Sequence, residues 1–590
     1  MLKPAEERLN YSDLLTPPTG YDVDFAVGTT YSLDLEALVG VPIALSLSEE
    51  MEGTFKENPI YVLEALRRSV DKFAIFCEAG QIKTPQNANN VFSLMENSVF
   101  EVALANEKSF HPKVWLIKYR NEEEEELYRF LVLTRNLTFD RSWDLAIGLE
   151  GKKNKRKTLK NRPISDFLRF LIPYSKDDEK NDQIQSLISD LDYVHFDPVD
   201  KHIPSFEFYP LGIDGYGKDE TGIFENYHHL LIISPFLSNQ TVSSLNRLSL
   251  KNASKTLITR RTELAKLDET VVDVFDIYAL KDLVVEGEGA ISGENEVNEM
   301  AQLQDIHAKL YARTKYNEHQ IFIGSANCSE RAFNGNVEFL LRLDYQKYGF
   351  RIQHLLNDLF GEDERDNPFE KIEILPEKGE TDTILSDEME KAIKQLCRAS
   401  SKAYVNGEEN NYSLKITFDE IPSNVEFSIS PLLSKQSLLL ANEIVFYDLG
   451  LLELGQFYTI TAIKDGETLT RIIKIPTEGI PAERDNEVFR SIIKDKYTFL
   501  RYVAFLLSDD FILAAIEQLE MKRNGAGKWD TTMSDYPVLY ENMLKAAARS
   551  PEKLQDVENI MNYIKDDEII PEEFNRLYET FIGATKKVRK

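Results

Sequence analysis

The chain repeats one polar pattern in two places, and this repeat constrains its fold more than any other feature of the sequence. Each copy has a histidine and a lysine two residues apart, followed by a hydroxyl residue, an asparagine and an acid. The residues are His111, Lys113, Thr134, Asn136 and Asp144 in the first copy and His307, Lys309, Ser325, Asn327 and Glu338 in the second. Because each copy lies among short apolar runs, we expect two related halves whose polar residues meet at one site.

The apolar pattern predicts α/β structure around both copies. Short apolar runs alternate with helical stretches over residues 22–150 and again over 228–345. We therefore predict an α/β fold built from a pseudo-twofold pair of α/β/α halves, at residues 1–200 and 201–370.

In each half the histidine and the lysine are expected inside a strand that forms a hairpin with the next strand. Residues two apart in a strand project from the same face, so both side chains would face the site. The predicted strands are 31–38, 72–77, 111–119, 128–134 and 143–149 in the first half, and 229–234, 255–259, 305–313, 320–323 and 337–343 in the second. The acidic run Glu122–Glu126 is interpreted as a solvated turn of the first hairpin.

The rest of the chain predicts two further domains. Residues 371–480 are expected to form a connecting helix, at about 385–400, and a small β-sandwich, because alternating apolar strands begin near Tyr412. Helical periodicity predicts a C-terminal helical domain over residues 481–590. Neither region carries a motif of catalytic residues, so binding or scaffolding is expected there.

Composition excludes several classes of protein. The chain has 69 basic and 99 acidic residues, a formal charge of −30, which argues against a surface that embraces nucleic acid everywhere but allows one basic channel. Three cysteines without CxxC spacing indicate neither a disulfide framework nor a zinc site. Since neither a signal peptide nor an apolar run of membrane-spanning length is evident, a cytoplasmic protein without membrane contact is expected.

The residue types of the pattern suit phosphodiester chemistry. An imidazole can attack phosphorus or donate a proton, and a lysine beside it can neutralise phosphate oxygens. A carboxylate that binds the other ring nitrogen would orient the histidine, and a second histidine would protonate the leaving oxygen. An isolated HxK in a strand is common and means little, but the ordered pattern occurs twice.

The motifs resemble those of the phospholipase D superfamily, whose signature is HxK followed by GSxN and NxE. The second copy is close, with Gly324-Ser325-Ala326-Asn327 and Asn336-Val337-Glu338, whereas the first has Leu133-Thr134-Arg135-Asn136 and Ser142-Trp143-Asp144. The aspartate that the lipase branch places five residues after the lysine is absent, because Lys118 and Thr314 stand there. In lacking this aspartate, the sequence resembles the nuclease and tyrosyl-DNA phosphodiesterase branches, which also use HxK with an asparagine.

The resemblance implies two phospholipase D-like halves around one site, a phosphohistidine intermediate, and no metal or cofactor. It also implies that His111 is the nucleophile and His307 the general acid, although the reverse assignment stays open. All ten residues of the two copies would then belong to the catalytic and substrate-binding set, with Thr134 assigned to substrate binding.

A basic run follows the first copy and suggests the substrate. Seven of the eleven residues from Lys152 to Arg162 are basic. Five of them are assigned to a nucleic-acid backbone near the site: Lys152, Lys153, Lys155, Arg156 and Lys157. A solvated loop is the alternative.

The leading hypothesis is a metal-independent nuclease that acts on DNA rather than RNA. The resemblance places such enzymes in prokaryotic restriction or phage defence, with a helicase or other ATPase as partner. Two alternatives stay open. One is a non-catalytic nucleic-acid-binding or assembly subunit whose first motif is degenerate, and the other is a phospholipid phosphodiesterase.

Overall fold

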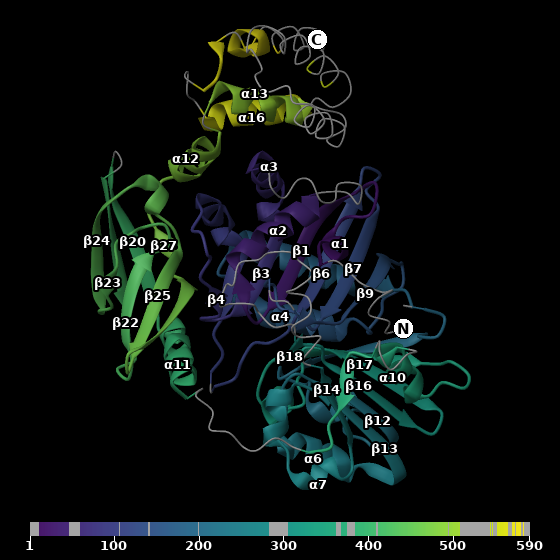
Figure 1. Ribbon diagram of the computed structural model, residues 1–590. Coiled ribbons are helices and arrows are strands. Elements are labelled where there is room, and N and C mark those ends of the chain that lie inside the picture. The colour runs from purple at the N-terminus through teal and green to yellow at the C-terminus, as the bar shows by residue number, and fades with distance from the viewer. Residues whose placement is uncertain are drawn as a thin grey trace, which may run out of the picture.

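The structure is a computed structural model that describes residues 11–46, 59–105, 107–139, 142–198, 200–281, 305–361, 367–374, 384–408, 411–493 and 495–507, and parts of 543–582. Two mixed sheets form its centre, one above the other in Figure 1. The sheet of the first half has the order β10 (Val194–Phe196), β9 (Ala146–Lys153), β7 (Glu126–Leu133), β6 (Val114–Asn121), β1 (Tyr21–Thr30), β3 (Phe73–Glu78) and β5 (Val99–Val102).

The second sheet repeats this order. It runs β11 (Ser205–Leu211), β18 (Glu338–Tyr345), β17 (Glu318–Gly324), β16 (Leu310–Lys315), β12 (Tyr227–Ile233), β13 (Ser249–Thr259), β14 (Asp276–Leu280) and β19 (Phe369–Lys371). In each sheet the first long strand, β1 or β12, pairs parallel with β3 or β13 and antiparallel with β6 or β16. The predicted pair of related α/β halves is therefore present as two sheets of matching topology.

One hydrophobic core joins the two halves. It contains side chains from strands of both sheets and from helix α4 (Arg162–Ser175). Phe130 of β7 lies 5.4 Å from Phe339 of β18, measured between ring centroids, and Phe167 of α4 lies 5.3 Å from the same ring. Burying these aromatic rings holds the halves face to face and fixes how their strand ends meet.

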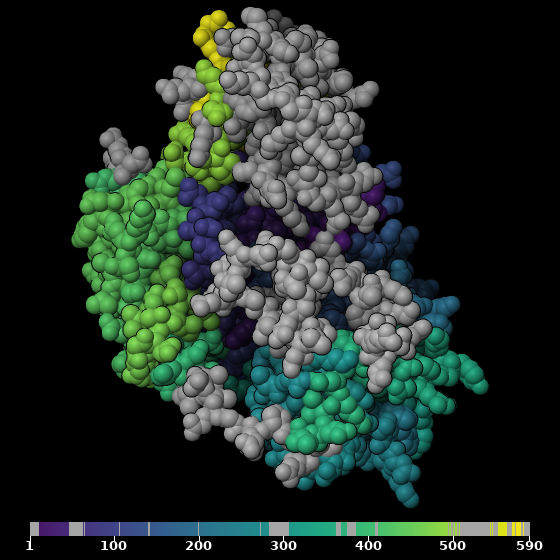
Figure 2. All heavy atoms as spheres, viewed as in Figure 1, coloured from purple at the N-terminus to yellow at the C-terminus, as the bar shows by residue number. Residues whose placement is uncertain are grey.

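Two sheets lie in the region where a sandwich was predicted, and one of them includes strands from the first half. The two sheets share one buried cluster and pack with α11 (Ile384–Arg398). The sheets are β2 (Leu33–Asp34), β4 (Ile82–Lys83), β26 (Glu467–Lys474), β25 (Phe457–Lys464), β22 (Glu426–Pro431) and β23 (Leu438–Leu439), and β24 (Glu443–Leu449), β21 (Asn411–Phe418), β20 (Ser401–Glu408) and β27 (Thr477–Glu478). Figure 2 shows the sandwich, in green, directly against the purple and blue first half. We call α11 and these strands from 401 to 478 the C-terminal β module.

The helical region also takes up an element of the first half. Buried side chains of α3 (Pro59–Ser69), α12 (Glu483–Ile492), α13 (Lys496–Leu507) and α16 (Glu552–Ile564) form one cluster. An ion pair of 3.0 Å joins Arg67 of α3 to Asp556 of α16. Much of the predicted helical stretch after Leu507 lies outside the described residues.

Two predictions about the first half were wrong in detail, and one strand was missed. Residues 31–38 are not a strand: after the short β2, helix α2 (Leu35–Ser46) begins, because Leu35, Leu38 and Leu45 recur at helical spacing and are buried. Strand β1, which was not predicted, precedes them. The acidic turn is shorter than expected, since Glu126 belongs to β7 and forms an ion pair of 2.9 Å with Lys118.

Candidate active site

Both HxK segments lie just before a strand rather than inside one, which corrects the prediction. Lys113 directly precedes β6, and Lys309 directly precedes β16. The lysine amino group of each segment turns back and donates to the backbone carbonyl of its own histidine, at 2.9 Å in the first copy and 2.6 Å in the second. The histidine and the lysine of each copy therefore lie together at one end of their sheet because of the local backbone conformation. The alternation of side chains along a strand, which the sequence suggested, is not the cause.

The backbone of each histidine is held by the opposite half. The His111 N–H donates to the carbonyl of Val337 at 2.9 Å. The His307 N–H donates to the carbonyl of Trp143 at 3.0 Å, where β8 (Ser142–Trp143) pairs parallel with β15 (Asp305–Ile306). Val337 and Trp143 are the middle residues of the two NxE-like motifs, so the two motif copies interlock symmetrically.

The acids are exchanged between the halves. Nδ1 of His111 lies 2.9 Å from Oε2 of Glu338, and Nδ1 of His307 lies 2.9 Å from Oδ1 of Asp144. Each half therefore supplies the carboxylate that orients the histidine of the other half. The Glu338 side chain is fully buried, whereas His111 and His307 keep 13% and 15% of their side chains exposed. Because a carboxylate accepts the Nδ1 proton, Nε2 of each ring keeps its lone pair in the neutral form.

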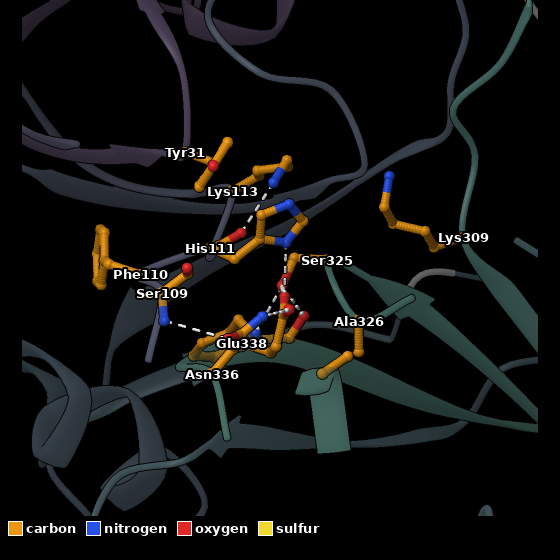
Figure 3. A network of polar contacts seen from close by, with 12 residues as sticks. Tyr31, Ser109, Phe110, His111, Lys113, Lys309, Ser325, Ala326, Asn336 and Glu338 are labelled. Atoms are coloured by element: carbon orange, nitrogen blue, oxygen red, sulfur yellow. Dashed lines mark hydrogen bonds and ion pairs between the residues drawn. The ribbon is translucent and has the colours of Figure 1, made fainter. Parts of the chain in front are cut away.

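The hydroxyl residues hold the carboxylates. Ser325 donates to Oε2 of Glu338 at 2.5 Å, and Thr134 donates to Oδ1 of Asp144 at 2.9 Å. Figure 3 shows Ser325 and Glu338 converging on the imidazole of His111. Ser142 donates to Asp144 much as the Asn336 amide donates to Glu338. The first copy, although looser in sequence, reproduces the contacts of the second.

The two lysines place their amino groups in a buried part of the site. Lys113 is 1% and Lys309 0% exposed. Within the described part of the chain neither ammonium group has a carboxylate in ion-pair contact. Burial lowers the pKa of Lys113 to about 7, while Glu338 and Asp144 raise it; burial and the charge of Lys113 lower the pKa of Lys309 well below its ordinary value. Two desolvated amino groups without contacting counterions favour an anion between them.

Burial sets the charge of the imidazoles. It lowers the pKa of His111 to about 4, against the opposing effect of Glu338, and it lowers the pKa of His307 to about 3. Burial alone would raise the pKa of Asp144, but the hydrogen bond and charge of His307 hold it below its ordinary range. At neutral pH both rings are therefore neutral in the unliganded protein and Asp144 is ionised.

The two asparagines differ. Oδ1 of Asn136 accepts a hydrogen bond of 3.3 Å from the backbone N–H of Tyr31. Oδ1 of Asn327 is buried and has no hydrogen-bond partner among the described residues. The pseudo-symmetry of the site is thus incomplete at this position.

Tyr31 is a residue at the site that the sequence did not indicate. Its ring lies 5.0 Å from the ring of His111, and the amino group of Lys113 lies 5.9 Å from its centroid. The loop after β1 brings it there. Recognising β1 would have placed Tyr31 at a strand end beside the HxK segment, which was the missing signal.

The structure does not bring the basic run to the histidines. Ala146, at one end of β9, pairs with Leu133 beside the site, whereas Lys152 pairs with Leu127 near the other end. Six residues along a strand correspond to roughly 20 Å. Lys153 forms ion pairs with Glu126 and Asp190, and Lys157 with Asp192, at 2.6 to 2.7 Å. Lys155 and Arg156 are exposed in the same run.

Two further features of the described residues bear on the site. No group of three or more His, Cys, Asp or Glu side chains in this part of the chain is arranged to hold a metal ion. No helix among the same residues is long and apolar enough to cross a membrane.

Comparison with known proteins relates a stretch of the second α/β half to a family. Residues 220–363 match the model of the NgoFVII restriction endonuclease N-terminal PLD domain, where PLD stands for phospholipase D. This stretch contains the whole second copy of the motif. No curated protein matches the sequence at a significant level.

Several solved structures resemble the fold at low identity. A yeast tyrosyl-DNA phosphodiesterase is 13% identical, with 56% of this chain and 84% of that chain covered and a TM-score of 0.34. A polyphosphate kinase from Porphyromonas gingivalis is 14% identical, with 61% of this chain and 46% of that chain covered and a TM-score of 0.34. A phosphatidylserine synthase from Haemophilus influenzae Rd KW20 is 10% identical, with 66% of this chain and 89% of that chain covered and a TM-score of 0.35. At these scores the likenesses carry no argument about activity.

The family match covers the half with the better-preserved motif, and the interlocked geometry supplies the other half of the same site. The expected resemblance is thereby confirmed. Residues 220–363 therefore form a phospholipase D superfamily domain.

Proposed function

We propose that this protein is a phosphodiesterase that hydrolyses DNA through a phosphohistidine intermediate. The carrying observation is the pair of exchanged histidine–carboxylate contacts, His111 with Glu338 and His307 with Asp144, around two buried lysines. This arrangement offers two imidazoles with free Nε2 atoms and two buried lysine amino groups, which a bound phosphate would favour in their charged form, for the nonbridging oxygens. A phosphodiester requires this combination of nucleophile, acid and anion stabilisation.

In the first step, Nε2 of His111 attacks phosphorus. The new nitrogen–phosphorus bond forms as the bond to the leaving oxygen breaks, and His307 gives its proton to that oxygen. His307 is neutral in the free protein, so it must gain a proton when substrate binds. The negative phosphodiester and Asp144 both favour its charged form.

In the second step, His307 removes a proton from water, and the water oxygen attacks phosphorus. The nitrogen–phosphorus bond breaks and His111 is released. Lys113 and Lys309 would hold the phosphate oxygens in both steps. The equivalent geometry of the two histidines is equally consistent with the reverse assignment, in which His307 attacks and His111 is the acid.

DNA is proposed as the substrate on one observation. The family model that matches residues 220–363 is described as part of a restriction endonuclease. A role in restriction is proposed on the same description, whereas a helicase or ATPase partner stays a prediction.

The basic run enters the proposal as a distant binding surface for the same DNA. About 20 Å corresponds to roughly six base pairs along a duplex at 3.4 Å per pair. Lys152, Lys155 and Arg156 would bind backbone phosphates there. Replacing all three by alanine should reduce the slope of log affinity against log salt by about 0.9 for each phosphate that is no longer neutralised. An unchanged slope would show that these three residues do not bind DNA phosphates and that the DNA is bound only at the candidate active site.

A non-catalytic role was the main alternative, because the first motif is degenerate in sequence. Thr134 and Asp144 nevertheless make the contacts that Ser325 and Glu338 make. This observation favours an active enzyme over a binding subunit.

The deciding experiment incubates the purified protein with labelled single-stranded and duplex DNA in EDTA. Cleavage that disappears in H307A and H111A, with accumulation of phosphorylated protein in one of them, is expected. Binding of DNA without cleavage under any tested condition would instead favour the non-catalytic alternative. Cleavage of phospholipid vesicles but not of DNA would favour the lipid phosphodiesterase.

A further inference from the structure

The segment that leads into His111 is held from both sides. On one side, the Ser109 N–H donates to Oδ1 of Asn336 at 3.1 Å, in the motif that ends with Glu338. On the other, the Phe110 N–H donates to Oε2 of Glu78 at 2.7 Å. Figure 3 shows Ser109 and Phe110 directly beside His111 and Asn336. The position of the imidazole therefore depends on both contacts.

Glu78 is a buried carboxylate whose cationic partner comes from another part of the chain. Only 2% of its side chain is exposed. Its Oε1 forms an ion pair with Nζ of Lys394, and this amino group also donates to the carbonyl of Lys108. Lys394 belongs to α11, so a side chain of the C-terminal β module contacts both Glu78 and the segment before His111.

Helix α11 is fixed to the sandwich and to the first half independently of Lys394. Its residues Ala392 and Ile393 lie in the sandwich core. A Cβ atom on Gly80, two residues after Glu78, would lie 2.8 Å from Ile393, so the helix lies directly against the end of β3. An ion pair of 3.0 Å also joins Glu390 to Arg471 of β26. The helix would therefore stay in place without the Lys394 interactions.

In the second half, the segment before the histidine is held by a residue of the same half. Thr29 of β1 and Ile233 of β12 occupy equivalent positions, because each lies beside the first residue of the strand that follows an HxK segment. In the neighbouring parallel strands, Thr29 pairs with Phe76 and Ile233 pairs with Ile258. Glu78 and Arg260, each two residues further on, therefore occupy the same place in the two repeats. Nε of Arg260 donates to the carbonyl of Ile306, the residue before His307, at 2.8 Å. One half holds its histidine segment with its own guanidinium, and the other uses a carboxylate paired with the C-terminal β module.

We propose that Lys394 is a positioning residue for His111, and that through it the C-terminal β module completes one side of the active site. His307 does not depend on this module. The inference gives residues 384–478 a role in the site and goes beyond the proposed nuclease function.

The test compares K394M, which removes the charge with little change in volume, with K391M on the exposed face of the same helix. The first readout is acylation of each histidine by diethyl pyrocarbonate, followed by peptide mass spectrometry. K394M should raise the rate at His111 about threefold or more and leave His307 unchanged, as expected for a loosened segment. K391M should change neither rate.

The second readout rests on the proposed function. In a DNA cleavage assay, kcat of K394M should fall about tenfold with KM unchanged, because a small misplacement of a reacting group is costly. If the protein cleaves no DNA, the acylation result still decides the inference. Equal rates at His111 in K394M and the unsubstituted protein would overturn it.

A second variant covers the case in which K394M does not fold. E78Q keeps the volume and the acceptor for Phe110 but removes the charge that Lys394 contacts, and it should again alter acylation at His111 alone. Loss of folded structure in both variants, or equal changes at both histidines, would also overturn the inference, because the ion pair would then serve the whole fold.

Discussion

The two halves of the site differ in sequence and agree in geometry. The second half has GSxN and NxE, whereas the first has Thr134 for the serine and Asp144 for the glutamate. Both hydroxyls donate to a carboxylate, and both carboxylates bind Nδ1 of the histidine across the interface. A motif that looks eroded can therefore be complete once the donor and acceptor roles are compared instead of the residue names.

The histidines give the largest expected effect and the strongest test of this equivalence. H111A and H307A should each reduce kcat for DNA cleavage by about 10⁴-fold or more, since nucleophile and acid act in the same step. Single-turnover cleavage measures the loss, and circular dichroism checks the fold. Full activity in H111A would show that the first half is not catalytic.

Exchange of the acids is tested by the amide variants. E338Q and D144N should each lower kcat by about 10³-fold, because the imidazole loses the negative charge that fixes its tautomer and stabilises its protonated form. Acylation with diethyl pyrocarbonate should change at His111 in E338Q and at His307 in D144N. A change at the histidine of the same half would contradict the exchanged pairing.

The titration of the two histidines should show that both imidazoles are neutral at neutral pH. The pKa of His111 is lowered from 6.5 to about 4, so the unfolded chain binds more protons than the folded one between these values. Stability therefore falls as pH decreases from 6.5 towards 4. Histidine hydrogen–deuterium exchange read by mass spectrometry gives each midpoint directly. E338Q should lower the midpoint of His111 further, because the opposing negative charge is removed.

The smallest effects concern the hydroxyls. T134A and S325A should each reduce kcat about tenfold, in line with a hydrogen bond to a charged group. T134S should stay within about twofold of the unsubstituted protein, since it keeps the donor. A large loss in S325A with none in T134A would show that the halves are unequal despite their matching contacts.

Much of the fold and the residues of the candidate site could be proposed from the sequence, because the same polar residue types recur in the same order in both copies. The partners across the interface could not: Glu338 follows His307 closely in sequence but orients His111. The strand predicted at 31–38 failed because Leu33 and Leu35 alternate over too few residues to separate a strand from the start of a helix. Tyr31 was missed with it.

The basic run shows a second reason for failure. Lys152 follows Asp144 by only eight residues in the sequence, yet an extended strand carries it away from the site. Closeness along the chain predicts closeness in space within a helix or a turn, but not along a strand.

The six-stranded sheet has a consequence for how the protein is made. Ile82 of β4 pairs with Ile472 of β26, so this strand finds its neighbour only after 390 further residues (472 − 82) have been synthesised. At typical rates of synthesis this interval is on the order of tens of seconds, during which the backbone groups of β4 facing β26 remain available to other chains. Assembly of this sheet would then be the late step at which newly made protein is most exposed to aggregation.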